Sequence, residues 1–280
     1  MNPSAHLPGA AWLNGEFLSP GEARVPALDA GFLFGDGLFE TLRTYGGRPF
    51  LLRAHLERLC AGARALDIPL PSELDNVACA VVARSGLPDC TVRLTVTRGV
   101  AGAGTPTVLV TALPLRAWPA RVYEEGARAG WLWPRSAGRP GPSVKSTSYQ
   151  WALLGRREAE ARGWNEGLFL DGAGTHVTEG SATNLFAVVD GNVWTPPVEA
   201  CLPGVTRAEV LRLARQEGMA VREAPLPVDV VSRADEVFLT SSLAEVVPVT
   251  QLEGKPVGRG APGPVGRALR AVYLEEARRT

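Results

Sequence analysis

The sequence predicts a protein of the α/β (α+β) class with two domains. The chain has 280 residues, of which 45% are apolar, and this is enough for two hydrophobic cores. Strand-like and helix-like segments occur on both sides of residues 115–125, a stretch that shows no period of its own. We therefore expect an N-terminal α/β domain over residues 1–115, a linker over 116–125 and a barrel-like domain over 126–280.

Residues 1–115 predict a hairpin followed by strands and helices. The dipeptide Asn14-Gly15 tolerates positive φ and is typical of a hairpin turn. Leucines recur at helical spacing in "LLRAHLERLCAGARAL", and "SELDNVACAVVARSG" has Ser72 as a candidate N-cap and Gly86 as a stop signal. Further strands are expected within residues 38–45, 90–99 and 105–115.

Residues 126–280 are richer in strands, several of which are joined by short glycine turns. Many short strands with a few helices are typical of a barrel-like α/β domain. The strands are expected within residues 127–135, 166–197 and 235–257, and the helices within 149–163, 204–218 and 264–279.

The composition excludes several classes of function. Lysine plus arginine and aspartate plus glutamate each number 29, so no basic field is available to attract nucleic acid or an anionic membrane. The N-terminal segment has no basic region before a long apolar run, and no window reaches the ~18 apolar residues of a membrane span. We expect a cytoplasmic protein with a small-molecule partner.

Cysteine and histidine usage argues against a metal site. Cys60, Cys79, Cys90 and Cys201 lie far apart without a CxxC pair, and the three histidines are equally scattered. This spacing fits reduced thiols better than a disulfide framework, and it predicts no metal site.

Lysine is rare in this chain, and one lysine gives the first indication of chemistry. Only Lys145 and Lys255 occur, so an amine has been retained at these positions either for its reactivity or by chance. Lys145 precedes "STSY" and a predicted helix, at a junction where a side chain can enter a cleft, although a solvated loop lysine is the default alternative. The distinctive chemistry of lysine is the Schiff base with a carbonyl, and pyridoxal phosphate is the commonest cofactor that needs one.

Pyridoxal phosphate also needs an anion beside its pyridine nitrogen. Glu179 lies in "VTEGSATN", among small residues that allow close approach of the ring. An acid in a surface turn is the alternative interpretation of this residue.

The phosphate group needs hydrogen-bond donors. A helix predicted to begin in "CLPGVTRAEVLRLA" offers free N–H groups and a dipole that favour an anion, with Thr206 alternatively serving only as its N-cap. The stretch "LTSSL" ends a predicted strand with hydroxyl groups, and Arg53 in the first turn of an earlier helix would add a charge-assisted contact. The candidate phosphate contacts are Arg53, Gly204, Val205, Thr206, Ser241 and Ser242.

Taken in order, these segments resemble the fold-type IV pyridoxal-phosphate enzymes, which include branched-chain aminotransferases, D-amino-acid aminotransferases and aminodeoxychorismate lyases. The resemblance runs through "FLFGDGLFETLRTYGGRPFLLRAHLERL", "KSTSY", "VTEGSATNLF", "LPGVTRAEV" and "DEVFLTSSLAEVVPV", and covers nearly the whole chain. It implies a smaller N-terminal α/β domain, a larger C-terminal pseudo-barrel domain, and pyridoxal 5'-phosphate bound between them. It also implies a homodimer in which the neighbouring subunit completes the site.

The resemblance implies a role for each candidate residue. Lys145 is expected to form the Schiff base and to shuttle the proton, Glu179 to pair with the pyridine nitrogen, and Tyr149 to hydrogen-bond the phenolic oxygen. The phosphate is expected to contact Arg53, Gly204, Val205, Thr206, Ser241 and Ser242. Candidates for the substrate pocket, each equally open to a packing or surface role, are Phe32, Phe34, Arg98, Trp118 and Arg135.

The branches of this family differ at short motifs. D-amino-acid aminotransferases of the best-known type carry an Arg-x-His pair in a loop that reads "TRGVAGAGTPT" here, and branched-chain aminotransferases typically read "FEG" and "SGTAAE" where this chain reads "FET" and "TSSLAE". Aminodeoxychorismate lyases commonly show "FET" and a "TNSL"-like stretch, which this chain resembles except at Ser241, where such lyases often have Asn. In that branch Thr41 would help to eliminate pyruvate.

The motifs therefore favour a lyase that converts 4-amino-4-deoxychorismate to 4-aminobenzoate and pyruvate in folate biosynthesis. The alternative is a class IV aminotransferase of the branched-chain or D-amino-acid type that uses 2-oxoglutarate. A catalytically silent binding protein that retains the fold is a further hypothesis, although every expected cofactor contact has a chemically suitable residue.

Overall fold

The computed structural model describes residues 7–134 and 144–279, and the chain divides into two compact units. Unit 1 comprises residues 1–117, 144–149 and 277–280, and unit 2 comprises residues 118–143 and 150–276. The division after residue 117 lies within the segment predicted as a linker, of which helix α4 (Ala120–Glu125) forms part of unit 2. Residues 144–149 belong to the first unit although they follow it by nearly 30 positions in the sequence.

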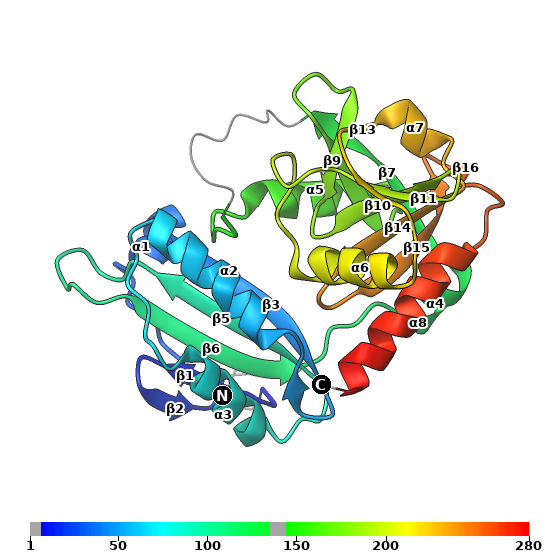
Figure 1. Cartoon of the computed structure of the whole chain (residues 1–280). Helices are drawn as coiled ribbons and strands as arrows, with labels where there is room; N and C mark the ends of the chain where they lie inside the picture. The colour runs from blue at the N-terminus through cyan, green and yellow to red at the C-terminus, as the bar shows by residue number, and fades with distance from the viewer. Residues whose placement is uncertain (1–6, 135–143, 280) are drawn as a thin grey trace. The chain divides into compact units, whose positions relative to one another are not determined.

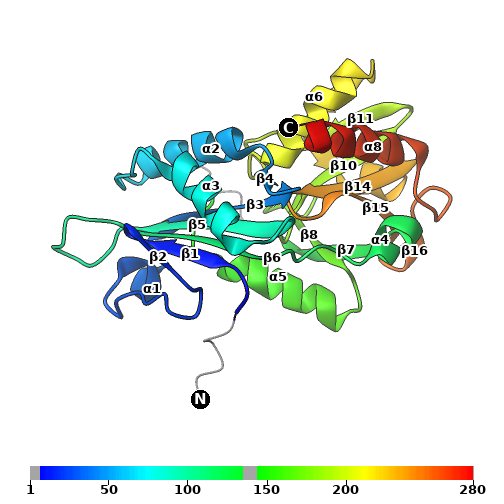
Figure 2. The same ribbon diagram turned by 90° about the horizontal axis from the view of Figure 1, so that it is seen from below.

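Unit 1 is built on an antiparallel sheet of six strands in the order β2-β1-β6-β5-β3-β4. Helices α2 and α3 pack on one face of this sheet, as Figure 2 shows. The strands are β1 (Ala10–Leu13), β2 (Glu16–Leu18), β3 (Gly37–Tyr45), β4 (Arg48–Pro49), β5 (Cys90–Thr97) and β6 (Thr107–Pro114), and the helices are α1 (Ala30–Phe34), α2 (Leu52–Ala65) and α3 (Leu74–Ser85).

Local sequence explains most of these elements. The β1–β2 hairpin turns at Asn14 and Gly15 with φ of 46° and 105°, as predicted. Helix α3 ends at Gly86, whose φ of 66° satisfies the left-handed C-cap that was expected. The prediction of Ser72 as its N-cap is wrong, because the helix starts one residue later, after Glu73, without a side-chain cap.

Unit 2 contains a mixed sheet of ten strands in the order β12-β11-β10-β14-β15-β7-β8-β9-β13, with β16 paired to β15. Helix α5 lies against β7 and β8, and helix α6 lies against β14 (Figure 1). The strands are β7 (Ala127–Pro134), β8 (Glu166–Leu170), β9 (His176–Gly180), β10 (Asn184–Val189), β11 (Asn192–Thr195), β12 (Val221–Glu223), β13 (Leu226–Pro227), β14 (Glu236–Ser241), β15 (Glu245–Leu252) and β16 (Lys255–Pro256). The helices besides α4 are α5 (Gln150–Ala161), α6 (Val205–Gln216), α7 (Val228–Ser232) and α8 (Pro264–Arg279).

The sheet of unit 2 curls back on itself. Strands β9 and β10 are separated in the sheet by β14, β15, β7 and β8, yet only residues 181–183 join them in the chain. Three residues span at most about 10 Å, so the sheet must bend until the two strands meet. The backbone N–H of Gly180 donates to the carbonyl of Thr183 at 2.8 Å at this point. We call residues 180–184 the seam, and the curled sheet agrees with the predicted barrel-like domain.

Within the described residues, no helix is long and apolar enough to cross a membrane. Nor do the described His, Cys, Asp and Glu residues form a group of three that could hold a metal ion.

Candidate active site

The residues predicted to form the site are divided between the two units. Each unit brings its own members together. Unit 1 holds Thr41, Arg53, Lys145 and Tyr149, and unit 2 holds Glu179, Gly204, Val205, Thr206, Ser241 and Ser242.

Lys145 is fixed to unit 1 by backbone hydrogen bonds to β3. Its carbonyl accepts from the N–H of Phe39 at 3.0 Å, and the N–H of Thr147 donates to the carbonyl of Gly37 at 2.9 Å. A side chain at Gly37 would meet the Val96 carbonyl at 2.6 Å, so this close approach requires glycine. The segment that carries Lys145 is therefore held as an additional short strand along β3.

The ring of Phe39 organises the side chains around Lys145. The Lys145 Nζ atom lies 4.8 Å from the ring centroid, and the Arg93 guanidinium carbon lies 3.9 Å from it. The ring of Tyr149 meets Phe39 edge-on, with centroids 5.2 Å apart. Phe39 is 4% exposed and thus a fixed platform that places an amine, a guanidinium and a phenol side by side.

Arg93 joins this group although sequence analysis did not select it. Burial lowers the pKa of Arg93, and the nearby Tyr149 opposes that effect. Its guanidinium donates to the hydroxyls of Thr95 at 3.2 Å and Thr41 at 3.4 Å, and among the described residues no carboxylate pairs with it. The available signal was its place in β5, where it alternates with the buried residues Val92 and Leu94 and so projects from the opposite face.

A buried ion group lies behind the same strand. Glu40 accepts from Arg58 Nε and from His55 Nδ1, both at 2.7 Å, and Glu40 and His55 are 0% and 1% exposed. Burial raises the pKa of Glu40, but the hydrogen bonds and charges of Arg58 and His55 outweigh it and lower the pKa to about 2. Burial also lowers the pKa of His55, so its Nδ1–H donates to an ionised Glu40 while the ring stays neutral.

Arg53 does not belong to this group. Its side chain is 93% exposed and pairs with Glu57 at 2.9 Å. Arg58 is five residues further along α2, and at about 100° per residue its side chain points about 140° away from that of Arg53, toward β3. The structure therefore gives no support to Arg53 as a phosphate contact, and the arginine that α2 buries is Arg58.

In unit 2, Glu179 is joined to the segment that leads into α6. The Glu179 Oε2 atom accepts from the backbone N–H of Leu202 at 2.9 Å, and Asn184 Nδ2 donates to the Leu202 carbonyl at 2.9 Å. Both polar groups of one peptide residue are thus held by side chains from the two strands of the seam. A Cβ at Gly204 would overlap the Asn184 side-chain oxygen, so the close approach of the segment requires glycine.

The start of α6 has the properties of an anion site. Gly204 is the N-cap residue, so the alternative of Thr206 as the N-cap is wrong, and Thr206 lies in the first turn. The hydroxyls of Thr206 and Ser242 lie 3.4 Å apart. The neighbouring Thr240 Oγ1 atom is buried and has no hydrogen-bond partner among the described residues. Free N–H groups, hydroxyls and the helix dipole together favour a phosphate here.

The predicted pocket residues are dispersed. Phe32 and Phe34 lie on α1 and are 75% and 76% exposed, and Arg98 pairs with Asp36 at 2.6 Å. Trp118 packs against the core of unit 2. Arg135 lies outside the described residues.

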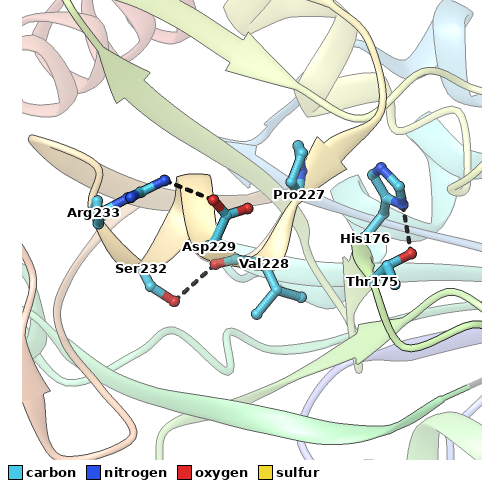
Figure 3. Close-up of a pocket in the computed structure, with 7 residues that line it drawn as sticks. All are labelled: Thr175, His176, Pro227, Val228, Asp229, Ser232 and Arg233. Atoms are coloured by element: carbon cyan, nitrogen blue, oxygen red, sulfur yellow. Dashed lines mark hydrogen bonds and ion pairs between the residues drawn. The ribbon is translucent and has the colours of Figure 1, made fainter.

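A separate hollow of about 620 Å³ lies on unit 2, and Figure 3 shows its lining. Asp229 and Arg233 form an ion pair at 2.6 Å with both side chains mostly exposed, and the Ser232 hydroxyl donates to the Val228 carbonyl. These groups satisfy one another, and no predicted site residue lines this hollow. The lining residues are Thr175, His176, Pro227, Val228, Asp229, Ser232 and Arg233.

Comparison with known proteins identifies relatives over nearly the whole chain. The family model described as amino-transferase class IV matches residues 37–252. A putative branched-chain-amino-acid aminotransferase of Methanocaldococcus jannaschii is 36% identical, with 94% of this chain and 95% of that protein aligned. A D-alanine aminotransferase of Bacillus licheniformis is 33% identical, with 95% of this chain and 98% of that protein aligned.

Solved structures of two further relatives have the same fold. The branched-chain amino acid aminotransferase of Escherichia coli superposes with a TM-score of 0.90 at 30% identity, covering 95% of this chain and 94% of that one. A branched-chain amino acid aminotransferase from T.th., solved with pyridoxamine 5'-phosphate, gives a TM-score of 0.89 at 34% identity, covering 97% of this chain and 95% of that one.

Proposed function

Because the chain belongs to the class IV aminotransferase family, whose cofactor is pyridoxal 5'-phosphate, we propose that it is an aminotransferase of the branched-chain type. The observation that carries this proposal is the 36% identity, over 94% of the chain, to a protein named as a putative branched-chain-amino-acid aminotransferase. The lyase expected from the "FET" and "TSSL" motifs receives no such support. The alternative drawn from the sequence is therefore preferred to the main expectation.

The residues of this chain fit the cofactor. The first turn of α6, the hydroxyls of Thr206 and Ser242 and the unpartnered buried hydroxyl of Thr240 suit a phosphate. The carboxylate of Glu179 suits a protonated ring nitrogen, and Ser241, Gly204 and Val205 remain proposed contacts. When bound, the cofactor supplies an aldehyde that condenses with amines and a ring that accepts the electron pair left after loss of a substrate proton.

The chain's own groups carry the proton and orient the substrate. We assign to the Lys145 amine the removal of the proton from the substrate α-carbon and its return one step later. Its backbone bonds to β3 and the nearby ring of Phe39 hold the amine in place. Tyr149, which stacks edge-on against the same ring, is assigned the hydrogen bond to the phenolic oxygen of the cofactor.

Arg93 is proposed to bind a substrate carboxylate. An aminotransferase that uses 2-oxoglutarate must hold a dicarboxylate and an apolar amino acid in turn. Arg93 lies beside the ring that Lys145 approaches, and among the described residues it donates only to hydroxyls, so its guanidinium is available for a bidentate contact. Arg93→Ala should raise the KM for 2-oxoglutarate at least tenfold and that for leucine less.

We also propose a homodimer. Leu28, Phe32 and Phe34 lie at and beside α1 with 67%, 75% and 76% of their surfaces exposed, and an apolar patch of this kind is typical of a protein interface. Light scattering should give the mass of two chains for the purified protein. A dilution-dependent mass for Phe32→Ser/Phe34→Ser is expected, and a wild-type monomer would contradict the proposal.

A substrate panel tests the proposed reaction. The purified protein with cofactor is offered L- and D-amino acids with 2-oxoglutarate, and separately 4-amino-4-deoxychorismate. Turnover of L-leucine, L-isoleucine and L-valine is expected, without release of 4-aminobenzoate. Formation of 4-aminobenzoate and pyruvate, with no oxoglutarate-dependent turnover, would instead establish the lyase.

The two lysines provide a control for the enzyme itself. Lys145→Ala should lose the visible absorption band of the bound cofactor and all measurable turnover. Lys255→Ala, at an exposed position in β16, should retain both. Wild-type protein that takes up no cofactor would favour the catalytically silent binding protein.

A further inference from the structure

Glu166, the first residue of β8, is a buried carboxylate that the proposed reaction does not use. Its side chain is 3% exposed within unit 2. The Oε1 atom accepts from the N–H groups of Gly167 and Ser181, both at 3.0 Å, and from the Ser181 hydroxyl at 2.5 Å. The Oε2 atom accepts from the Thr183 hydroxyl at 3.1 Å. Most of these donors belong to the seam.

No cation compensates this carboxylate among the described residues. Other buried acids of unit 2 have partners, since Glu209 pairs with Arg212 and Glu245 pairs with Arg270. Glu236 accepts from two N–H groups at the start of α8 and thus interacts with a helix dipole. Glu166 has only hydroxyl and peptide donors, and burial raises its pKa. A buried acid without a counter-ion is costly, so its hydrogen bonds to the seam need an explanation.

The seam is packed too tightly to hold its shape without this acceptor. A Cβ at Gly180 would overlap the Thr183 hydroxyl and would lie 3.1 Å from the Glu166 carboxyl carbon. The register of β8 and β9 shifts between Phe169 and Leu170, opposite Glu179, as at a β-bulge. A bulge re-aims the side chain that it carries. The direction of Glu179 is therefore set by the bulge on one side and by the Glu166-bound seam on the other.

The seam also controls the approach to α6. Glu179 stands just before it and Asn184 ends it, and these two side chains hold the N–H and the carbonyl of Leu202. Gly204, two residues later, is the N-cap of α6. Movement of the seam would therefore shift both the acid assigned to the ring nitrogen and the helix start assigned to the phosphate.

We propose that Glu166 is a positioning residue, which fixes the seam and through it the Glu179 carboxylate and the Leu202–Gly204 segment. The assignment rests on the proposed role of Glu179 toward the cofactor. Glu166 itself touches neither cofactor nor substrate in this assignment. It acts by keeping Ser181 and Thr183 in one arrangement.

Hydrogen exchange of the cofactor-free protein tests the first half of this proposal. Glu166→Ala should speed amide exchange at residues 180–184 and at Leu202 by tenfold or more, while Glu166→Gln, which keeps an acceptor oxygen for Ser181, should remain within about threefold of wild type. Glu236→Ala is the matched control, because it removes a buried acid of the same unit. Its faster exchange should be confined to the start of α8.

Cofactor affinity and kinetics test the second half. Glu166→Ala should weaken cofactor binding about tenfold and lower kcat by about 10- to 100-fold with little change in KM, because displaced groups no longer meet the cofactor. Glu166→Gln should restore most of both values. The double variant Glu166→Ala/Glu179→Gln should be little slower than Glu179→Gln alone, since both changes act through one carboxylate.

Several results would overturn the proposal. Unchanged exchange at residues 180–184 in Glu166→Ala would show that the seam does not depend on this carboxylate. Losses of affinity and kcat no larger than those of Glu236→Ala, or strictly additive effects with Glu179→Gln, would show a general structural role. If Glu179→Gln kept full turnover, the role proposed for Glu179 would fail, whereas the exchange data would still decide whether Glu166 holds the seam.

Discussion

Glu40 in unit 1 and Glu166 in unit 2 are both buried carboxylates, but the protein stabilises them in different ways. Glu40 has a guanidinium and an imidazole within 2.7 Å, and its pKa is lowered to about 2. Glu166 has only hydroxyl and peptide donors, and burial raises its pKa. Charge therefore fixes the strand that carries Phe39 and Thr41, whereas neutral donors fix the seam beside Glu179.

The difference teaches that the two units should respond to pH in opposite directions. A carboxyl whose folded pKa is lowered stabilises the fold above its unfolded pKa of about 4.5, and this stabilisation is lost as the pH falls toward about 2. A carboxyl whose folded pKa is raised binds its proton more tightly in the fold, so its favourable contribution is present below pH 4.5 and is lost as the pH rises. Acid thus weakens the Glu40 group and relieves Glu166.

The largest expected effect is the loss of one member of the Glu40 group. Arg58→Ala should lower the free energy of unfolding by about 3–5 kcal/mol at pH 7, because it leaves a buried carboxylate without its guanidinium. Arg53→Ala, on the exposed face of the same helix, should change it by less than about 0.5 kcal/mol. Urea denaturation measures both values. Equal losses would mean that the buried pair contributes no more than a surface one.

A smaller effect is expected for the uncompensated acid. Glu166→Ala should cost about 1–3 kcal/mol, since Ser181 and Thr183 lose an acceptor but no opposite charge is left buried. The same denaturation experiment compares it with Arg58→Ala. A loss larger than that of Arg58→Ala would reverse the ranking of the two groups.

The smallest effect, and the sharpest on sign, is the pH dependence of two amide variants. Relative to wild type, Glu166→Gln should gain stability as the pH rises above 4.5, by at most about 1.4 kcal/mol per pH unit, because it has no proton to lose. Glu40→Gln should show the opposite slope below pH 4.5, where wild type loses the stabilisation that the variant never had. Parallel slopes for the two variants would refute the comparison.

The sequence predicts the residues that act alone better than those that act across strands. Lys145 and Glu179 could be selected because a rare lysine and an acid among small residues are local signals. Arg53 was preferred to Arg58 because the leucine spacing of α2 does not determine which arginine faces the sheet. Phe39 and Arg93 meet only through the pairing of β3 with β5, and no local pattern records that register.

The fold follows the same rule. The β1–β2 hairpin and the end of α3 at Gly86 depend on positive φ at a single position, which composition reveals. The closure of the unit 2 sheet depends on strand order, which brings Glu166 to the seam through pairing with β9. In the sequence, "NEGLFL" is only the start of a strand, and nothing in it announces a buried acid that binds residues 15 and 17 positions later.

The central claim is that this chain moves an amino group rather than eliminating pyruvate. The most direct measurement is a single half-reaction, in which cofactor-loaded protein is mixed with L-leucine without any acceptor. The account predicts about one equivalent of the corresponding 2-oxo acid per chain, a shift of the cofactor absorption band, and reversal on addition of 2-oxoglutarate. No oxo acid and no spectral change with leucine, alongside pyruvate release from 4-amino-4-deoxychorismate, would contradict it.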